Sequence, residues 1–221
     1  MKNKPQLGRG IYTLSDISNI LHLPNSRIRY WVNVFWDDKL SKVSEMKYSW
    51  GEKQDKAVDF HTLIEFYTFY KLRELGISTN KILKAHSVIS ESLKTNFPFA
   101  SSRILTDGNS ILFSPDIQTI INADETLQYN LKEVIEPFCK KIDFNSNSLA
   151  YKFWPLGKKN SIVVDPHHQF GQPIIKGTNI LAETLYRMNK AGESIEFIAK
   201  LYELKPKNVK DSINYFNKLA A

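Results

Sequence analysis

The chain has 221 residues and a formal net charge of +7, with 42% hydrophobic and 24% charged residues. This composition is typical of a folded globular protein and excludes a disordered chain. No apolar run reaches the length of about 18 residues that a membrane-spanning helix needs. Residues 1–10 are polar and lack the apolar core of a signal peptide. We therefore expect a cytoplasmic protein with no membrane partner.

Positive charge is concentrated near the start of the chain. Residues 1–36 hold five Lys or Arg residues and one acid, Asp16, which favours a polyanionic partner for this part. The single cysteine, Cys139, has no partner for an internal disulfide and no companions at metal-ligand spacing. We expect no metal and no cofactor.

Residues 12–34 carry the pattern of two short helices joined by a tight turn. Thr13 and Asp16 have the spacing of a capping box, so a helix should begin near Leu14. The run 22–24 breaks the pattern with a proline, which is tolerated at the start of a second helix because its missing N–H would be unpaired there. The sequence predicts a helix-turn-helix.

The second helix has two chemically different faces. An apolar stripe that should pack on the first helix consists of Ile28, Trp31, Val32 and Phe35. The opposite face carries Ser26, Arg27, Arg29, Tyr30 and Asn33. Such a helix fits a DNA major groove, where Arg pairs with guanine and Asn with adenine. A short helical hairpin with a solvated polar face is the alternative that periodicity leaves open.

A twisted hairpin, or wing, is predicted over residues 39–60, after the helical pattern ends at residues 36–38. Tyr48 and Trp50 would lie on its inner face and Gly51 at its turn. Its lysines would contact the phosphate backbone and supply affinity rather than sequence preference: Lys39, Lys42, Lys47, Lys53 and Lys56. Lys47 and Lys53 are assigned to the candidate DNA surface. A solvated loop is the alternative.

Two further helices are predicted within residues 60–93. Gly76 fits the C-terminal cap of the first and Ser78 the N-cap of the second. The aromatic residues of the first helix favour core packing or a dimer contact over a ligand box. His61 and His86 have no partner at metal-ligand spacing, so we expect them to be structural or exposed.

Five short motifs follow one another between residues 11 and 100. They are Tyr-Thr-Leu-Ser-Asp-Ile, Arg-Tyr-Trp-Val, Asp-Phe-His-Thr-Leu-Ile-Glu, Leu-Arg-Glu-Leu-Gly-Ile-Ser and Phe-Pro-Phe-Ala. In this order they resemble the MerR-like winged-helix head of certain VapB-type antitoxins. The resemblance implies a DNA-binding winged helix-turn-helix domain with trailing helices over residues 1–100.

Residues 101–157 are predicted to form a mixed α/β middle domain. Its elements are strands at 103–106 and 110–113 around a turn at 107–109, a helix at 128–138 and a hairpin of 140–144 with 149–154. Its acids are scattered over different elements and offer no carboxylate pair for catalysis: Asp124, Glu125, Glu133 and Glu136. Residues 157–160 are the best linker candidate.

Residues 161–221 are predicted to form a C-terminal helical domain. A short strand at Ile162 and a segment rich in glycine and proline precede helices at 181–191, 195–201 and 206–216. Val209, Ile213 and Phe216 should form the buried stripe of the last helix. The tight turns are again helix-turn-helix-like, and the whole chain is predicted to be α+β, mostly α.

Two motifs in this region carry a second resemblance. Pro-Ile-Ile-Lys-Gly-Thr-Asn-Ile and Ala-Gly-Glu-Ser-Ile-Glu-Phe-Ile-Ala strongly resemble the small C-terminal domain of a large bacterial antitoxin family. These antitoxins pair with a PIN-like ribonuclease toxin. The resemblance implies a toxin-binding segment of Lys176, Gly177, Thr178 and Asn179, in which Lys176 is the candidate to block the acidic site of the toxin. Members commonly carry Arg where Asn179 stands, so no contact of that arginine is carried over.

An enzyme alternative rests on Asp165, His167 and His168, which a nuclease or other hydrolase would use. We discount it because adjacent histidines on an extended segment point to opposite sides, and no third ligand lies at a characteristic spacing. Gly177-Thr178 lacks the glycine run and the Lys-Ser/Thr of a phosphate loop, so a tight turn explains it.

The sequence as a whole predicts a non-enzymatic antitoxin. It should bind operator DNA as a homodimer on an inverted repeat, because one small module reads too few bases. It should also bind a PIN-like toxin through its C-terminal part. The alternative is a MerR-like transcriptional regulator that answers a small molecule through the middle domain.

Overall fold

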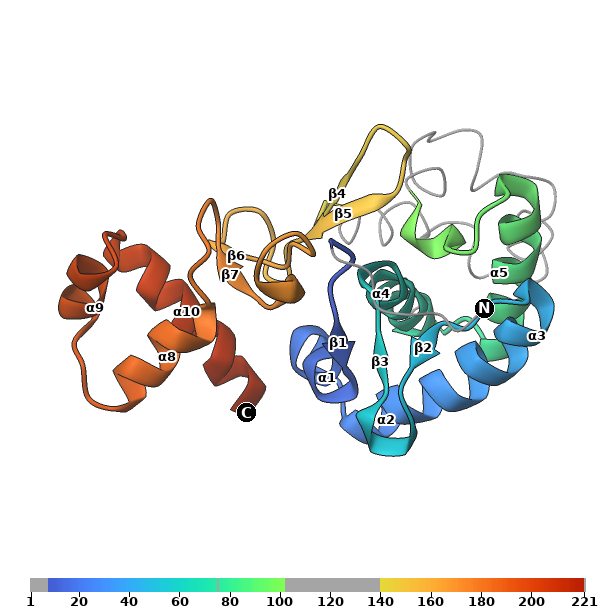
Figure 1. Cartoon of the computed structure of the whole chain (residues 1–221), viewed down its shortest axis with the longest axis horizontal. Helices are drawn as coiled ribbons and strands as arrows, with labels where there is room; N and C mark the ends of the chain where they lie inside the picture. Colours follow the sequence, from blue (N-terminus) through green and yellow to red (C-terminus); the bar gives the residue numbers. More distant parts are fainter. Residues whose placement is uncertain (1–7, 75, 102–139, 221) are drawn as a thin grey trace.

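The computed structural model describes residues 8–74, 76–101 and 140–220 (Figure 1). The described part is α+β and mostly helical, as expected. Its helices are α1 Leu14–Leu21, α2 Asn25–Tyr30, α3 Ser41–Ser44, α4 Phe60–Glu74, α5 Thr79–Leu93, α8 Ala182–Lys190, α9 Ile195–Leu201 and α10 Pro206–Ala220. Its strands are β1 Tyr12–Thr13, β2 Ser49–Trp50, β3 Ala57–Val58, β4 Ile142–Phe144, β5 Ala150–Phe153, β6 Ile162–Val163 and β7 Ile174–Ile175.

Most of the predicted middle domain lies outside the described residues. This applies to the strands at 103–106 and 110–113, the helix at 128–138, the four acids named above and Cys139. The hairpin that ends this segment is described and is confirmed, because β4 and β5 pair antiparallel with Ile142 opposite Phe153.

The predicted capping box at the start of α1 is confirmed. The Asp16 N–H donates to Thr13 Oγ1 over 3.1 Å, and the Thr13 N–H donates to an Asp16 carboxylate oxygen over 2.8 Å. His22 closes the helix with a left-handed φ of 55°, and α2 begins at Asn25. Because the connection is so short, the buried Ile28 side chain of α2 packs in the same core as the buried side chains of α1.

The expectation that the second helix ends at residues 36–38 is wrong. The helix continues through a π-helical segment, Trp31–Leu40, directly into α3. Trp36 is fully buried with its ring 4.5 Å from that of Phe66, and Asp37 accepts from Lys56 Nζ over 2.6 Å. These tertiary contacts hold a helical turn that the local sequence does not favour. Lys39 and Lys42 therefore lie on helices and not in a hairpin.

The wing is correspondingly shorter than predicted. β2 and β3 pair antiparallel with Ser49 opposite Val58, and β1 pairs with the other edge of β3 in the order β1-β3-β2. Gly51 lies at the predicted turn with a φ of +82°, where an added Cβ would come within 2.3 Å of the Asp55 carbonyl oxygen. Tyr48 is buried as predicted, whereas Trp50 is half-buried.

Helices α4 and α5 supply the centre of the larger core. The aromatic residues of α4 are packed inside it, which bears out the core interpretation: Phe60, Phe66, Tyr67 and Phe69. Gly76 takes a left-handed φ of 82° and Ser78 Oγ accepts the Lys81 N–H, so both predicted caps are present.

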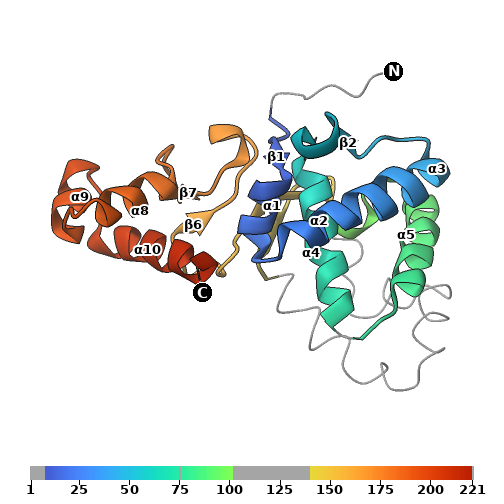
Figure 2. The same cartoon turned by 90° about the horizontal axis from the view of Figure 1, so that it is seen from below.

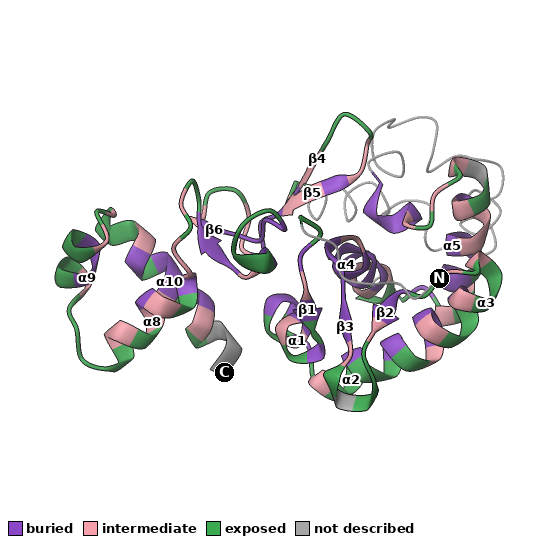
Figure 3. Cartoon of the chain, in the orientation of Figure 1, coloured by how far each residue is buried: buried purple, intermediate pink, exposed green. Residues whose placement is uncertain are grey.

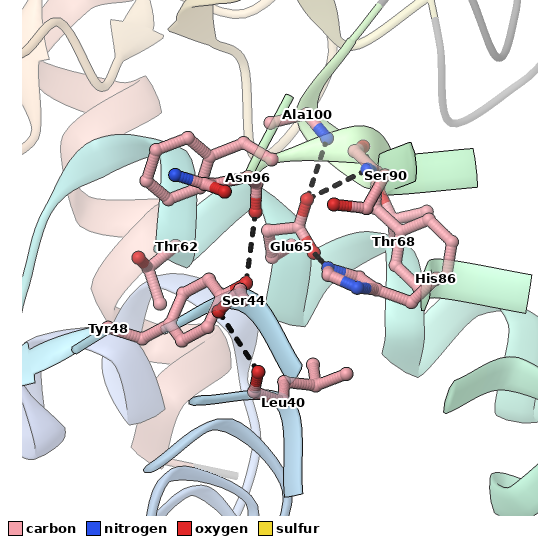
Figure 4. A network of polar contacts seen from close by, with 12 residues as sticks. Leu40, Ser44, Tyr48, Thr62, Glu65, Thr68, His86, Ser90, Asn96 and Ala100 are labelled. Carbon is pink, nitrogen blue, oxygen red and sulfur yellow. Dashed lines mark hydrogen bonds and ion pairs between the residues drawn. The ribbon is translucent and has the colours of Figure 1, made fainter. Parts of the chain in front are cut away.

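A buried carboxylate joins α4, α5 and the short turn at residues 98–100 (Figure 4). Glu65 is 0% exposed, and its Oε1 accepts the N–H groups of Phe99 and Ala100 over 2.7 and 3.2 Å. Its Oε2 lies 2.7 Å from His86 Nε2 of α5. A buried carboxylate is tolerated only where such partners surround it, so Glu65 and His86 are structural residues.

Residues 157–160 form a tight turn instead of an open linker. Phe153, the last residue of β5, exchanges two hydrogen bonds with Val164, of 2.9 and 2.8 Å, so the segments on both sides of the turn are paired. Lys158 also pairs with Asp143. A chain cut near Leu156 would remove the partner of both Phe153 hydrogen bonds. The predicted domain boundary at residues 157–160 stays a prediction.

Helices α8, α9 and α10 form a second core on β6 and β7, to one side of the larger core (Figures 1 and 2). The predicted stripe of α10 is correct only at Val209, because Ile213 and Phe216 are half-buried and Tyr215 is fully buried instead. Figure 3 shows α10 with buried, half-buried and exposed parts along its length. α10 packs against α8, α9 and β6 together, which moves its buried face around the helix.

The N-terminal strand is anchored against the C-terminal half of the chain. The Ile11 N–H donates to the Phe170 carbonyl over 2.9 Å, and the fully buried Tyr12 ring lies between two glycines. A Cβ on Gly171 would lie 2.0 Å from Tyr12 Oη, and one on Gly10 would lie 2.6 Å from Tyr12 Cε2. Only glycine fits at both positions, since both also have positive φ.

Gly171→Ala should therefore destabilise the protein by about 3 kcal/mol or more, because a steric clash with Tyr12 adds to the strain of a positive φ. Gly157→Ala is the matched control, since Gly157 has a similar φ of +86° and nothing within 4 Å of the added Cβ. Urea unfolding of both variants measures the difference. Equal losses in the two would show that Tyr12 does not require Gly171.

Candidate functional site

The predicted reading face of the second helix, which begins on α2 and ends at Asn33 in the π-helical segment, is exposed as a whole, and we call it the α2 face. Ser26, Arg27, Arg29, Tyr30 and Asn33 are all exposed, whereas Ile28 and Val32 on the opposite side are fully buried. A shallow hollow of about 540 Å³ lies over this face, lined by Asn25, Ser26, Arg29, Tyr30, Asn33 and Val34. This hollow thus presents the guanidinium group of Arg29 and the amide of Asn33, groups that hydrogen-bond to base edges, whereas Arg27 lines a neighbouring hollow.

A second hollow of about 540 Å³ lies between α2 and the end of α4. Its cationic groups are Arg27 and Arg73, and Tyr30 and Tyr70 are among its aromatic residues. Burial, with a hydrogen bond to Glu74, raises the pKa of Tyr70 to about 12. Arg73 was not among the predicted site residues. The sequence feature that could have pointed to it is its position as a basic residue in the last turn of α4.

The lysines predicted for the wing divide into two kinds. Lys47 is exposed just before β2, and Lys53 is exposed at the tip between β2 and β3. Lys56 instead donates to Asn33 Oδ1 over 2.7 Å and forms a half-buried pair with Asp37. Lys56 therefore positions Asn33 on the reading face and is not exposed toward a phosphate.

The segment predicted to bind a toxin forms the expected tight turn. The Thr178 N–H donates to the Ile175 carbonyl over 3.0 Å, and Gly177 has a φ of +77°. Lys176 is exposed, and its Nζ lies 5.4 Å from the centre of the Trp154 ring. Asn179 is also exposed, with its Oδ1 2.6 Å from His168 Nδ1.

The expectation that His167 and His168 point to opposite sides is wrong. His167 Nδ1 lies 3.2 Å and His168 Nε2 3.8 Å from the carboxylate of Asp165. The segment is a turn, closed by the His168 N–H on the Asp165 carbonyl, and not an extended strand. Lys152 Nζ is 3.2 Å from the same carboxylate, which makes this an ion-pair cluster.

Metal sites and membrane spans are two further features that bear on function. Among the described residues, no group of three or more His, Cys, Asp or Glu side chains is placed to hold a metal ion. Within the same part of the chain, no helix is long and apolar enough to cross a membrane.

Comparison with known proteins adds information on both halves of the chain. Residues 162–216 match a family described as "Protein of unknown function (DUF433)". The match covers β6, β7 and the greater part of the α8–α10 unit, and therefore includes the Lys176–Asn179 turn.

Two relatives from Mycobacterium tuberculosis extend the similarity to nearly the full length. "Putative antitoxin VapB45" is 20% identical over 92% of this chain and 92% of its own length. "Uncharacterized protein Rv2308" is 23% identical over 96% of this chain and 92% of its own. A crystal structure of Rv2018 from the same organism has a TM-score of 0.73 at 20% identity, over 96% of this chain and 100% of that one, which shows a shared fold.

The Asp165 cluster predicts how stability depends on pH. Burial raises the pKa of Asp165, but hydrogen bonds from the His167 N–H and from Lys152 outweigh it and hold the pKa below the ordinary value of 3.8. The folded protein thus gains stability above that value, and this gain is lost as the pH falls below it. Asp165→Asn should cost about 1–2 kcal/mol at neutral pH and make the loss between about pH 4 and pH 2 shallower. Urea unfolding across this range measures both, and an unchanged slope would contradict the pairing.

Proposed function

We propose that this protein is the antitoxin of a toxin-antitoxin pair and that it has a regulatory and not an enzymatic role. The observation that carries the proposal is the similarity to VapB45, because it spans 92% of both chains and so includes the α2 face as well as the C-terminal turn. We assign toxin binding to residues 162–216, which match a family of their own whose function is not known.

The N-terminal function in this proposal is operator binding by a MerR-like winged helix-turn-helix. Supporting it are the short turn between α1 and α2, the exposed cationic face and the β2–β3 hairpin with Lys47 and Lys53 beside it. α2 would enter the major groove while the hairpin contacts phosphates. Binding as a homodimer to an inverted repeat would supply the specificity that a single module lacks.

The C-terminal function in this proposal is the neutralisation of a PIN-like ribonuclease. The exposed Lys176 on a rigid turn supports it, since an ammonium group complements the acidic, metal-binding site of such an enzyme. The ring of Trp154 beneath Lys176 restricts the side chain and lowers the entropy that binding would cost. The regulator alternative depends on the predicted middle domain, residues 101–157, of which 102–139 lie outside the described residues.

Removal of the two arginines should abolish operator preference. In Arg27→Ala/Arg29→Ala, the absence of each base contact should cost about 1–3 kcal/mol against its preferred base. Lys84→Ala, at an exposed position of α5, serves as the control. Fluorescence anisotropy on promoter DNA and on a scrambled duplex measures the preference. Binding of the double variant with unchanged preference would place the reading face elsewhere.

Charge reversal at the turn should weaken toxin binding. Lys176→Glu would bring a carboxylate against an acidic surface, so we expect at least a ~10-fold loss of affinity for the toxin encoded beside this gene. Lys190→Glu, an exposed residue of α8, makes the same charge change away from the turn. Inhibition of the toxin's ribonuclease activity measures the effect, and full inhibition by Lys176→Glu would exclude this residue from the contact.

A further inference from the structure

Six lysines gather on three neighbouring segments of the C-terminal unit. We call them the lysine surface: Lys158 and Lys159 in the turn before β6, Lys176 after β7, and Lys205, Lys207 and Lys210 at the start of α10. All six are exposed. The stretches 157–160, 176–180 and 205–211 contain a single acid, Asp211, which is buried.

Hydrogen bonds join the three segments. The Lys176 N–H donates to the Ser161 carbonyl over 2.8 Å, and the Ser161 N–H donates to Asp211 over 2.8 Å. Lys207 Nζ contacts both Asp211 and the Lys159 carbonyl, at 2.6 and 3.2 Å. Lys210 follows Lys207 by three residues and so flanks the same side of α10. The charges are thus held together by a fixed backbone framework.

The single carboxylate does not cancel this charge. Burial raises the pKa of Asp211, but the hydrogen bonds from Lys207 and Ser161 outweigh it and lower the pKa overall, so Asp211 stays ionised and bound to Lys207. Lys158 is likewise paired with Asp143. Lys159, Lys176, Lys205 and Lys210 remain to contact a polyanion, together with the first turn of α10, which carries no acid.

We propose that the lysine surface binds the phosphate backbone of duplex DNA, independently of sequence. Lysine suits this partner because it acts as a flexible point charge, and phosphate contacts require no fixed geometry. A protein partner would need a different composition, since the centres of protein interfaces are depleted of lysine and built around aromatic or apolar residues. Of the large apolar side chains in these segments, Val209 is buried and Ile180 is half-buried, so neither forms an exposed centre for such an interface.

This surface is separate from the α2 face. Both views show α9 and the start of α10 at the end of the C-terminal helices that lies away from α2 (Figures 1 and 2). A DNA duplex bound by both surfaces would therefore be contacted at two different stretches, one by α2 and the other by the lysine surface. The consequence is extra affinity for DNA without any change in which sequence is preferred.

The test uses the full chain with Lys159→Gln/Lys205→Gln/Lys210→Gln. Lys176 is left intact because it belongs to the proposed toxin surface, and Lys207 because it holds Asp211. The probe is a labelled duplex of scrambled sequence, titrated by anisotropy from about 50 to 200 mM salt. Removing one phosphate contact should lower the slope of log K against log salt by ~0.9, so we expect a decrease of about 2–3 and at least a ~10-fold weaker affinity at low salt.

The matched control is Lys84→Gln/Lys94→Gln/Lys190→Gln, which removes the same charge at exposed positions on α5, next to the end of α5 and on α8. Its slope should change by less than about 1. The proposal is overturned if the lysine-surface variant keeps the wild-type slope, if the control weakens as much, or if the variant no longer binds toxin while its DNA binding is unchanged. Since the probe contains no operator, the result does not depend on whether α2 reads one.

Discussion

The burial of Tyr12 between Gly10 and Gly171 is the contact on which the arrangement of the two halves depends. The ring is part of β1, so it fixes the strand that pairs with β3 and leads into the capping box of α1. On its other side Gly171 belongs to the turn that carries Phe170, whose carbonyl accepts the Ile11 N–H. Because Gly171 has no Cβ, the Tyr12 ring can pack directly against it. This contact joins β1, and the helix-turn-helix that follows it, to the segment that precedes β7.

Charge is distributed so that buried ions stabilise the fold and exposed ions remain available to partners. Glu65, Asp165 and Asp211 are buried, and each is satisfied by backbone N–H groups together with a His or a Lys. The side chains of the α2 face and the lysine surface are exposed and largely cationic. Because these three carboxylates are bound inside the fold, they do not offset the exposed cations of the two surfaces.

Several elements were predictable because their signals are local. The capping box at Thr13, the cap at Ser78 and the β4–β5 hairpin each depend on a few adjacent residues, and all were confirmed. The buried stripe of α2 follows from helical periodicity alone. Exposure of Arg27 and Arg29 follows from the same periodicity, although their role in DNA binding stays a prediction.

The sequence by itself determined where helices begin, which face of α2 is apolar, and that residues 175–178 make a tight turn, since short-range spacing and glycine geometry govern each of these. Tertiary structure decided what spacing does not encode. It extended the second helix through Trp36 by burying that ring, moved Lys56 from a phosphate contact to a bond with Asn33, and turned both histidines toward Asp165. It also gathered six lysines from three separate segments, because their proximity comes from strand pairing and helix packing over long sequence distances.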